Sequence, residues 1–158
     1  MGGLIENVEV RVGMAKITLK SVMDRPGVAG NIFSLLGEEG FNIEHISQSS
    51  TGKKRCDISF AVDEKELPRI LPFLKSKLKE IRAEDVVSEK GMATVTVYGK
   101  RLAVSPGIAG KVFSLLAKRR INIEMISATL STISCLVRAK MAEEAMMALR
   151  EELKGGKE

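Results

Sequence analysis

Three successive hydrophobic patterns, typical of a strand, a helix and a second strand, occupy residues 15–49. After the turn Pro26-Gly27, apolar residues recur at i, i+3, i+4 and i+7, the spacing of one helix face. That face consists of Ala29, Ile32, Phe33 and Leu36. Proline fits the first helical turn and Gly40 ends the helix, so we predict a helix over about residues 27–39. Residues 41–49 alternate apolar with polar, which predicts a half-buried strand.

The same stretch occurs again eighty positions later in the chain. The matched segments are Pro26-Gly27 with Pro106-Gly107, Ala29-Gly30 with Ala109-Gly110, Phe33-Ser-Leu-Leu36 with Phe113-Ser-Leu-Leu116, and Asn42-Ile-Glu44 with Asn122-Ile-Glu124. A repeat of roughly 70–80 residues is too long for a solenoid unit and suits a small compact domain. We therefore expect two similar domains packed together.

The first module continues with two more strands and a second helix. A turn at residues 50–53 precedes a strand over 55–62, and Asp63 caps the next helix. A short strand is predicted over 83–88, with a break at Lys90-Gly91. The order β-α-β-β-α-β is that of the ferredoxin-like split βαβ arrangement. The fold class is therefore α+β, with an antiparallel sheet and two helices on one of its faces.

The second module lacks a last strand. Its predicted elements are strands at 92–99, 121–130 and 132–140 and helices at 107–119 and 142–153. The chain begins with a spare strand, which Gly13 separates from the first module's opening strand, and we expect this spare strand to complete the second sheet. The predicted domains are therefore residues 14–90 and residues 4–11 plus 91–154.

Composition restricts the function classes. The 158 residues are 44% hydrophobic and 28% charged, with no signal-peptide pattern and no apolar run near the ~20 residues of a membrane span, so we expect a cytoplasmic protein without membrane contact. The net charge of +5 reflects solvated helix faces and the hairpin turn around Lys53. Cys56 and Cys135 lie in apolar strands, where a thiol is usually a small buried hydrophobe.

Motifs for catalysis are scarce. The one histidine, His45, lies in a strand and its counterpart in the second repeat is Met125, which favours a partly buried residue over a catalytic base. Phosphate-loop and dinucleotide spacings do not occur, and the cysteines lack metal-site spacing, so we expect no enzyme, cofactor or metal. RNA-recognition modules share the element order, but aromatics are only 4% and the base-stacking motif is missing, so no nucleic-acid partner is expected.

The turn at Pro26-Gly27 suits a small amphoteric molecule. The N–H groups of a helix's first turn attract a carboxylate, and Asp24 just before the turn suits an ammonium group, so one turn offers both halves of a free α-amino acid. The alternative is that Asp24 merely caps the helix, a role worth about 1 kcal/mol. Local chemistry leaves both interpretations open.

Taken together, these segments resemble the tandem ACT domains of the aspartate kinase regulatory region over nearly the whole chain. The segments that carry the resemblance are Asp24-Arg-Pro-Gly-Val-Ala, Asn42-Ile-Glu, Cys56-Asp-Ile-Ser-Phe, Ser105-Pro-Gly-Ile-Ala, Asn122-Ile-Glu-Met-Ile-Ser and Ile133-Ser-Cys. Nothing in the chain corresponds to the family's catalytic kinase domain. The resemblance implies a regulatory part that binds an end-product amino acid, lysine or threonine, acts on an aspartate kinase catalytic domain or subunit, and forms a homodimer through its ACT sheets.

The resemblance also implies two ligand sites. In the first, Asp24 would take the ammonium group, Gln48 the side chain, and the backbone of Pro26, Gly27, Val28 and Ala29 the carboxylate, facing a wall of Asn122 and Ile123. The second would consist of Ser105, Pro106, Gly107, Ile108 and Ala109 facing Asn42, Ile43 and Glu44. A different hypothesis is a scaffold that has lost its ligand and only holds the subunits of a partner enzyme together.

Overall fold

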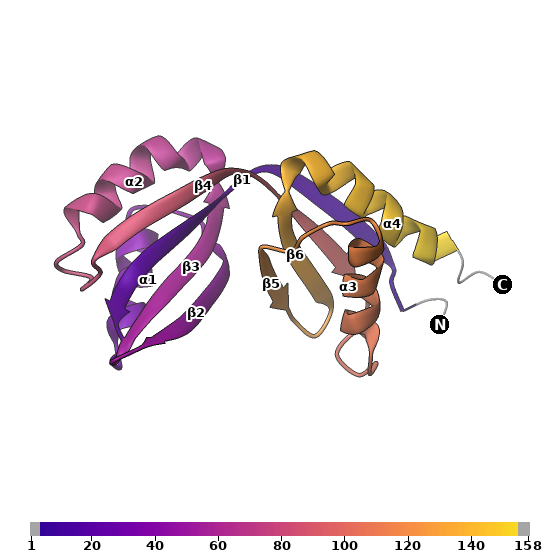
Figure 1. The fold of residues 1–158 in the computed structure, drawn as a ribbon, viewed down its shortest axis with the longest axis horizontal. Coiled ribbons are helices and arrows are strands. Elements are labelled where there is room, and N and C mark those ends of the chain that lie inside the picture. The colour runs from indigo at the N-terminus through magenta and orange to yellow at the C-terminus, as the bar shows by residue number, and fades with distance from the viewer. Residues whose placement is uncertain (1–3, 155–158) are drawn as a thin grey trace. The chain divides into compact units, whose positions relative to one another are not determined.

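The computed structural model describes residues 4–154, which form six strands, four α-helices and two short 3₁₀ turns (Figure 1). The strands are β1 (Asn7–Met23), β2 (Glu44–Gly52), β3 (Arg55–Asp63), β4 (Asp85–Tyr98), β5 (Met125–Ala128) and β6 (Thr132–Arg138). The helices are α1 (Val28–Glu38), α2 (Leu67–Ser76), α3 (Ile108–Lys118) and α4 (Ala142–Lys154). The 3₁₀ turns are Glu64–Glu66 and Ala139–Met141.

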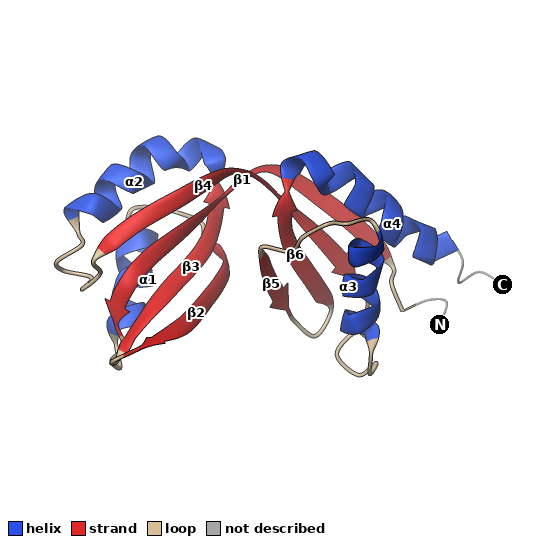
Figure 2. Ribbon diagram, viewed as in Figure 1, coloured by secondary structure: helices blue, strands red, loops and turns tan. Residues whose placement is uncertain are grey.

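The chain divides into two compact units. The first unit is Gly13–Lys90, and the second unit combines the residues up to Val12 with those from Gly91 onward. Hydrogen bonds order the strands β2-β3-β1-β4-β6-β5, so β1 and β4 contribute one part to each unit. Each unit has the ferredoxin-like set of four strands and two helices, which confirms the α+β class (Figure 2).

The core of the first unit forms between the sheet and helices α1 and α2. Every second residue of β3 faces these helices, as the period of a strand requires, and so does that of β1 until its register shifts between Leu19 and Val22. The strand residues of this core are Ala15, Ile17, Leu19, Val22, Cys56, Ile58, Phe60 and Val62. The helix residues are Ile32, Leu36, Leu67, Ile70 and Leu74, each at most 2% exposed.

The N-terminal segment belongs to the core of the second unit. Ile5 and Val8 are 6% and 1% exposed and cluster with the apolar residues of β4, β6, α3 and α4. The Glu6 N–H donates to the Tyr98 carbonyl at 2.7 Å, and the Tyr98 hydroxyl donates to the Glu9 carboxylate at 3.0 Å. The strand that the second sequence repeat lacks is therefore supplied by the start of the chain.

Two predicted strand boundaries were wrong. We expected breaks at Gly13 and at Lys90-Gly91, but β1 and β4 each continue through these positions. Both glycines adopt left-handed φ values, +75° and +72°, which residues with a Cβ rarely adopt. The chain therefore keeps its strand hydrogen bonding while it passes from one unit to the other.

Other local predictions hold with shifted ends. Asp63 accepts a hydrogen bond from the Lys65 N–H at 2.9 Å and so caps the 3₁₀ turn that leads into α2. The strand predicted over 121–130 is shorter, since β5 covers only Met125–Ala128. Cys56 and Cys135 are buried free thiols, as predicted. None of the helices in the described part of the chain is long and apolar enough to cross a membrane.

Candidate ligand site at the start of helix α1

The start of α1 exposes backbone donors. Gly27 is the N-cap residue with a φ of +90°, and no side chain caps the helix. The Val28 N–H donates to the Arg25 carbonyl at 3.3 Å, whereas the N–H groups of Ala29 and Gly30 have no hydrogen-bond partner among residues 4–154. These two groups lie at the positive end of the helix dipole, where they can donate hydrogen bonds to a carboxylate.

Asp24 lies beside this helix start without capping it. Its backbone N–H donates to the Lys54 carbonyl at 2.9 Å, which attaches it to the β2–β3 hairpin. Its carboxylate is exposed and accepts a hydrogen bond from Gln48 Nε2 at 3.3 Å. The capping interpretation of Asp24 was therefore wrong, because α1 has no side-chain cap, and the carboxylate remains available to a ligand.

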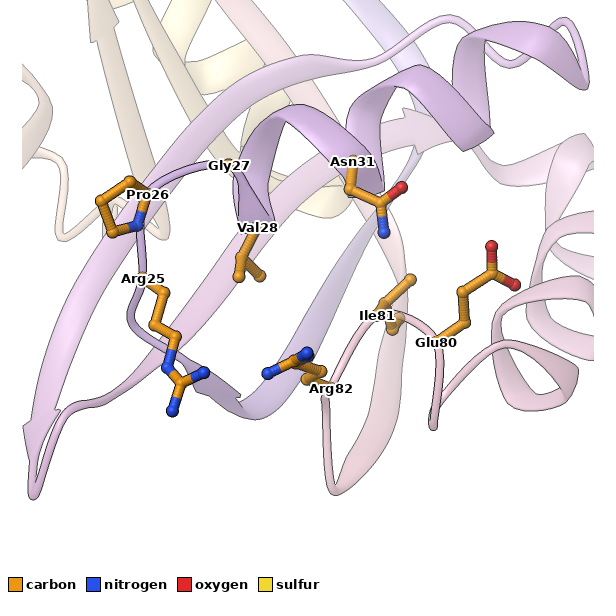
Figure 3. Close-up of a pocket in the computed structure, with 8 residues that line it drawn as sticks. All are labelled: Arg25, Pro26, Gly27, Val28, Asn31, Glu80, Ile81 and Arg82. Atoms are coloured by element: carbon orange, nitrogen blue, oxygen red, sulfur yellow. The ribbon is translucent and has the colours of Figure 1, made fainter.

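A pocket opens on one side of the same turn (Figure 3). It has a volume of about 410 Å³ and is lined by Arg25, Pro26, Gly27, Val28, Asn31, Glu80, Ile81 and Arg82. Sequence reasoning identified Pro26, Gly27 and Val28 but missed the other five residues. Glu80, Ile81 and Arg82 come from the segment between α2 and β4, and only the fold brings this segment to the start of α1.

The start of α3 in the second unit has the same backbone and different side chains. Gly107 is the N-cap residue with a φ of +83°, again without a side-chain cap. Val104 and Ala128 stand at the positions that correspond to Asp24 and Gln48. The Ser105 hydroxyl donates to the Arg101 carbonyl at 2.6 Å, and the Ile108 side chain is 7% exposed. The start of α3 therefore has backbone N–H donors for a ligand, but no side-chain carboxylate at the position of Asp24.

The predicted facing wall of each ligand site lies in a different unit from the helix start of that site. Asn122 and Ile123 lie in the second unit, between α3 and β5, and the Asn122 amide donates to Glu124 at 3.4 Å. Asn42, Ile43 and Glu44 lie in the first unit, at the far end of α1 from Gly27. Within a unit, the residues brought together are thus Asp24, the turn 26–29 and Gln48. The pairing of each site with a facing wall stays a prediction.

The histidine and the two cysteines of the chain do not belong to this site. His45 is 8% exposed at an irregularity of β2, and burial lowers its pKa against the opposing effect of the Glu44 charge, so its imidazole is neutral at pH 7. Burial raises the pKa of the Cys135 thiol to about 12. Burial, followed by the charges of Asp24 and Asp57, raises the pKa of Cys56. Both thiols are therefore protonated and unreactive at neutral pH.

Comparison with known proteins gives matches over both units. Residues 17–77 and residues 95–153 each match a family model described as an ACT domain. An aspartate kinase of Pseudomonas fluorescens (strain SBW25) is 31% identical over 146 residues, which are 92% of this chain and 35% of that protein. The chain thus spans about a third of the length of the curated relatives that it matches.

Two solved structures match over almost their whole length. One is the regulatory subunit of aspartate kinase from Thermus thermophilus in its ligand-free form, which is 30% identical with a TM-score of 0.86. The match covers 94% of this chain and 98% of that one. The other is a chain of the structure of aspartokinase alpha and beta subunits, which is 26% identical with a TM-score of 0.86 and coverage of 95% and 99%.

Proposed function

Because the chain belongs to the family of aspartate kinase regulatory subunits and consists of two ACT domains, we propose that it senses lysine or threonine as a feedback signal. In this proposal the bound amino acid changes the activity of an aspartate kinase catalytic domain or subunit. The coupling is a difference in ligand affinity between two arrangements of a homodimer, typically about 1–3 kcal/mol.

The observation that supports this proposal is the position of Asp24 beside the unpartnered N–H groups of α1. An α-amino acid bound there places its carboxylate on the N–H groups of Ala29 and Gly30 and its ammonium group on Asp24. Gln48, which already donates to Asp24 at 3.3 Å, lies where it can contact the ligand's side chain. The two opposite charges of the ligand therefore meet two complementary groups of one turn.

We assign the sensing site to the first unit, with Asn122 and Ile123 of a second copy as its facing wall. The homodimer joins the ACT sheets of the two copies. The site formed by Ser105 to Ala109, facing Asn42, Ile43 and Glu44, has Val104 in place of the aspartate. The turn of that second site therefore lacks the ammonium acceptor that Asp24 provides in the first, and its contribution to binding is the backbone N–H groups at the start of α3.

A thermal-shift screen of the twenty amino acids, followed by calorimetry on each hit, tests this proposal. A ligand at one hundred times its Kd stabilises the folded state by about 2.7 kcal/mol, which a thermal shift detects easily. Asp24→Ala should abolish the shift and leave the dimer intact, because it removes the partner of the ammonium group. Glu38→Ala removes an exposed carboxylate near the other end of α1 and should bind the ligand like the unmodified protein.

Two outcomes would contradict the proposal. In the first, Asp24→Ala retains the full ligand-induced shift, which would place the ligand elsewhere. In the second, none of the amino acids stabilises a well-folded dimer. The chain would then be a scaffold that holds kinase subunits together without a ligand of its own.

A further inference from the structure

The pocket beside α1 contains two guanidinium groups that form no ion pair with a carboxylate of residues 4–154. Within the described residues, the Arg25 side chain makes no hydrogen bond or ion pair. The Arg82 side chain makes a single hydrogen bond to residues 4–154, in which Nη1 donates to the Met23 sulfur at 3.3 Å. Two other surface cations of the same unit form ion pairs, Lys20 with Asp57 at 2.6 Å and Arg69 with Glu66 at 2.8 Å. The two pocket arginines therefore differ from the solvated ion pairs around them.

Backbone hydrogen bonds hold the two arginines near one another. The Met23 N–H donates to the Arg82 carbonyl at 3.1 Å, and the Arg25 N–H donates to the Met23 carbonyl at 3.1 Å. Both residues are thus attached to the end of β1. Figure 3 shows their side chains directed to the same end of the pocket, with Val28 above them. The backbone connections therefore place the two residues side by side, and from there both side chains reach the same end of the pocket.

The other lining residues complete a small-molecule site. Val28 and Ile81 form an apolar middle section, and Ile81 is only 2% exposed. Glu80 lies at the opposite end from the arginines and pairs with Lys77 at 3.1 Å, so its charge is partly neutralised (Figure 3). The volume of about 410 Å³ lies within the range of small-ligand pockets.

We propose that this pocket binds a small dianion, a metabolite that carries a phosphate group or two carboxylates, between Arg25 and Arg82. Two guanidinium groups match the charge of a dianion and donate paired hydrogen bonds to its oxygens. The pocket shares the turn residues Pro26, Gly27 and Val28 with the amino-acid site. The side chains Asp24 and Gln48 of the amino-acid site do not line it, and its charged groups come from Arg25, Arg82 and Glu80 instead. This proposal therefore does not rest on the sensing of lysine or threonine.

Calorimetric titration at pH 8 and constant ionic strength tests the pocket, with inorganic phosphate, succinate and acetate as probes. We expect saturable binding of phosphate or succinate and much weaker binding of the monoanion acetate. Arg25→Gln and Arg82→Gln should each weaken binding about tenfold or more, since each removes a charged hydrogen-bond donor. The substitutions leave the backbone hydrogen bonds of both residues in place. Glu80→Gln should strengthen binding, because it removes the pocket's acidic side chain.

The controls separate this site from general charge effects and from the amino-acid site. Arg150→Gln removes an exposed arginine of α4 and should leave the affinity unchanged. Asp24→Ala should also retain dianion binding. Binding of phosphate without succinate identifies a phosphate-bearing ligand, and the reverse identifies a dicarboxylate. The proposal is overturned if neither probe binds saturably, or if Arg25→Gln binds both as tightly as the unmodified protein.

Discussion

The starts of α1 and α3 share one backbone conformation, since Gly27 and Gly107 have φ values of +90° and +83° ahead of helices of 11 residues each. The sheets behind them are also alike. The hydroxyl groups of Thr18 and Ser59 in the first unit lie 2.9 Å apart, as do those of Thr96 and Ser134 in the second. The repeat has therefore retained the geometry that exposes backbone donors at the start of a helix.

The side chains around these two helix starts differ in chemistry. The first unit has the hydrogen-bonded pair Asp24 and Gln48, whereas the second has Val104, which is 70% exposed, and Ala128. Arg25 corresponds to Ser105 in the second unit. A helix start by itself accepts many anions, so the neighbouring side chains decide which ligand binds. The polar side chains beside the two helix starts are therefore concentrated in the first unit.

The largest expected effect is the loss of the second unit when residues 1–12 are deleted. The deletion removes Ile5 and Val8 from its core, and each buried side chain of this kind contributes about 1.5–3 kcal/mol. Hydrogen exchange should show lost protection across residues 92–153, with protection kept across 14–90. Unchanged protection of residues 92–153 would refute the role of the N-terminal strand.

The substitution Gly99→Ala should destabilise the second unit by about 1–3 kcal/mol, the usual cost of overpacking. A Cβ at this position would overlap the Leu4 carbonyl oxygen and lie 3.0 Å from Leu102 Cδ2. Denaturant unfolding measures the loss. Gly37→Ala is the matched control, because no atom lies within 4 Å of its added Cβ. Equal stability of Gly99→Ala and the control would contradict the close approach of residue 4.

Asp57→Asn should destabilise the first unit by about 1 kcal/mol at pH 7. This value already allows for the exposure of Lys20, since solvent weakens an exposed ion pair. The hydrogen bond from Lys20, and then that from the Ser21 N–H, lower the pKa of the Asp57 carboxyl. The stabilisation is therefore complete above the unfolded-chain pKa of about 3.9 and is lost as the pH falls through the lower folded pKa.

Thermal unfolding of the unmodified protein and of Asp57→Asn between pH 2 and pH 7 measures this effect. The difference in Tm between the two proteins should disappear at the acid end of the range. Glu38→Gln is the control, with an exposed carboxyl group and no expected difference at any pH. A difference for Asp57→Asn that persists unchanged at pH 2 would show that the carboxylate charge is not its cause.

The smallest expected effects are those of two glycine substitutions, one at the start of α1 and one at the start of α3. Gly30→Ala and Gly110→Ala add a Cβ into open space within a helix, so each should stabilise the ligand-free protein by about 0.5–1 kcal/mol. Gly30→Ala should in addition weaken amino-acid binding, because its methyl group lies beside the proposed carboxylate site. Calorimetry measures both affinities. Equal weakening by Gly110→Ala would contradict the assignment of the sensing site to the first unit.

The local elements could be predicted because their signals lie within a few residues of one another. The turn Pro26-Gly27, the helical spacing of α1 and the stop at Gly40 are all short-range features. The structure retains the turn and the stop and buries Ile32 and Leu36 of the predicted helix face, whereas Ala29 of that face is exposed. The strand breaks predicted at Gly13 and Gly91 were wrong because strand continuation depends on long-range contacts. Whether a glycine ends a strand depends on the partners of its neighbours, and these partners are distant in sequence.

The amino acid sequence alone determined the duplication, the element order, and the turn in which Asp24 precedes a helix start. The tertiary structure alone decided that Gln48 donates to Asp24 and that Arg82 reaches the pocket of Arg25. The physical reason is that periodicity and turn chemistry act between neighbouring residues. A ligand site, by contrast, needs side chains from separate elements, and only the pairing of β1 with strands that follow it in the chain brings these elements together.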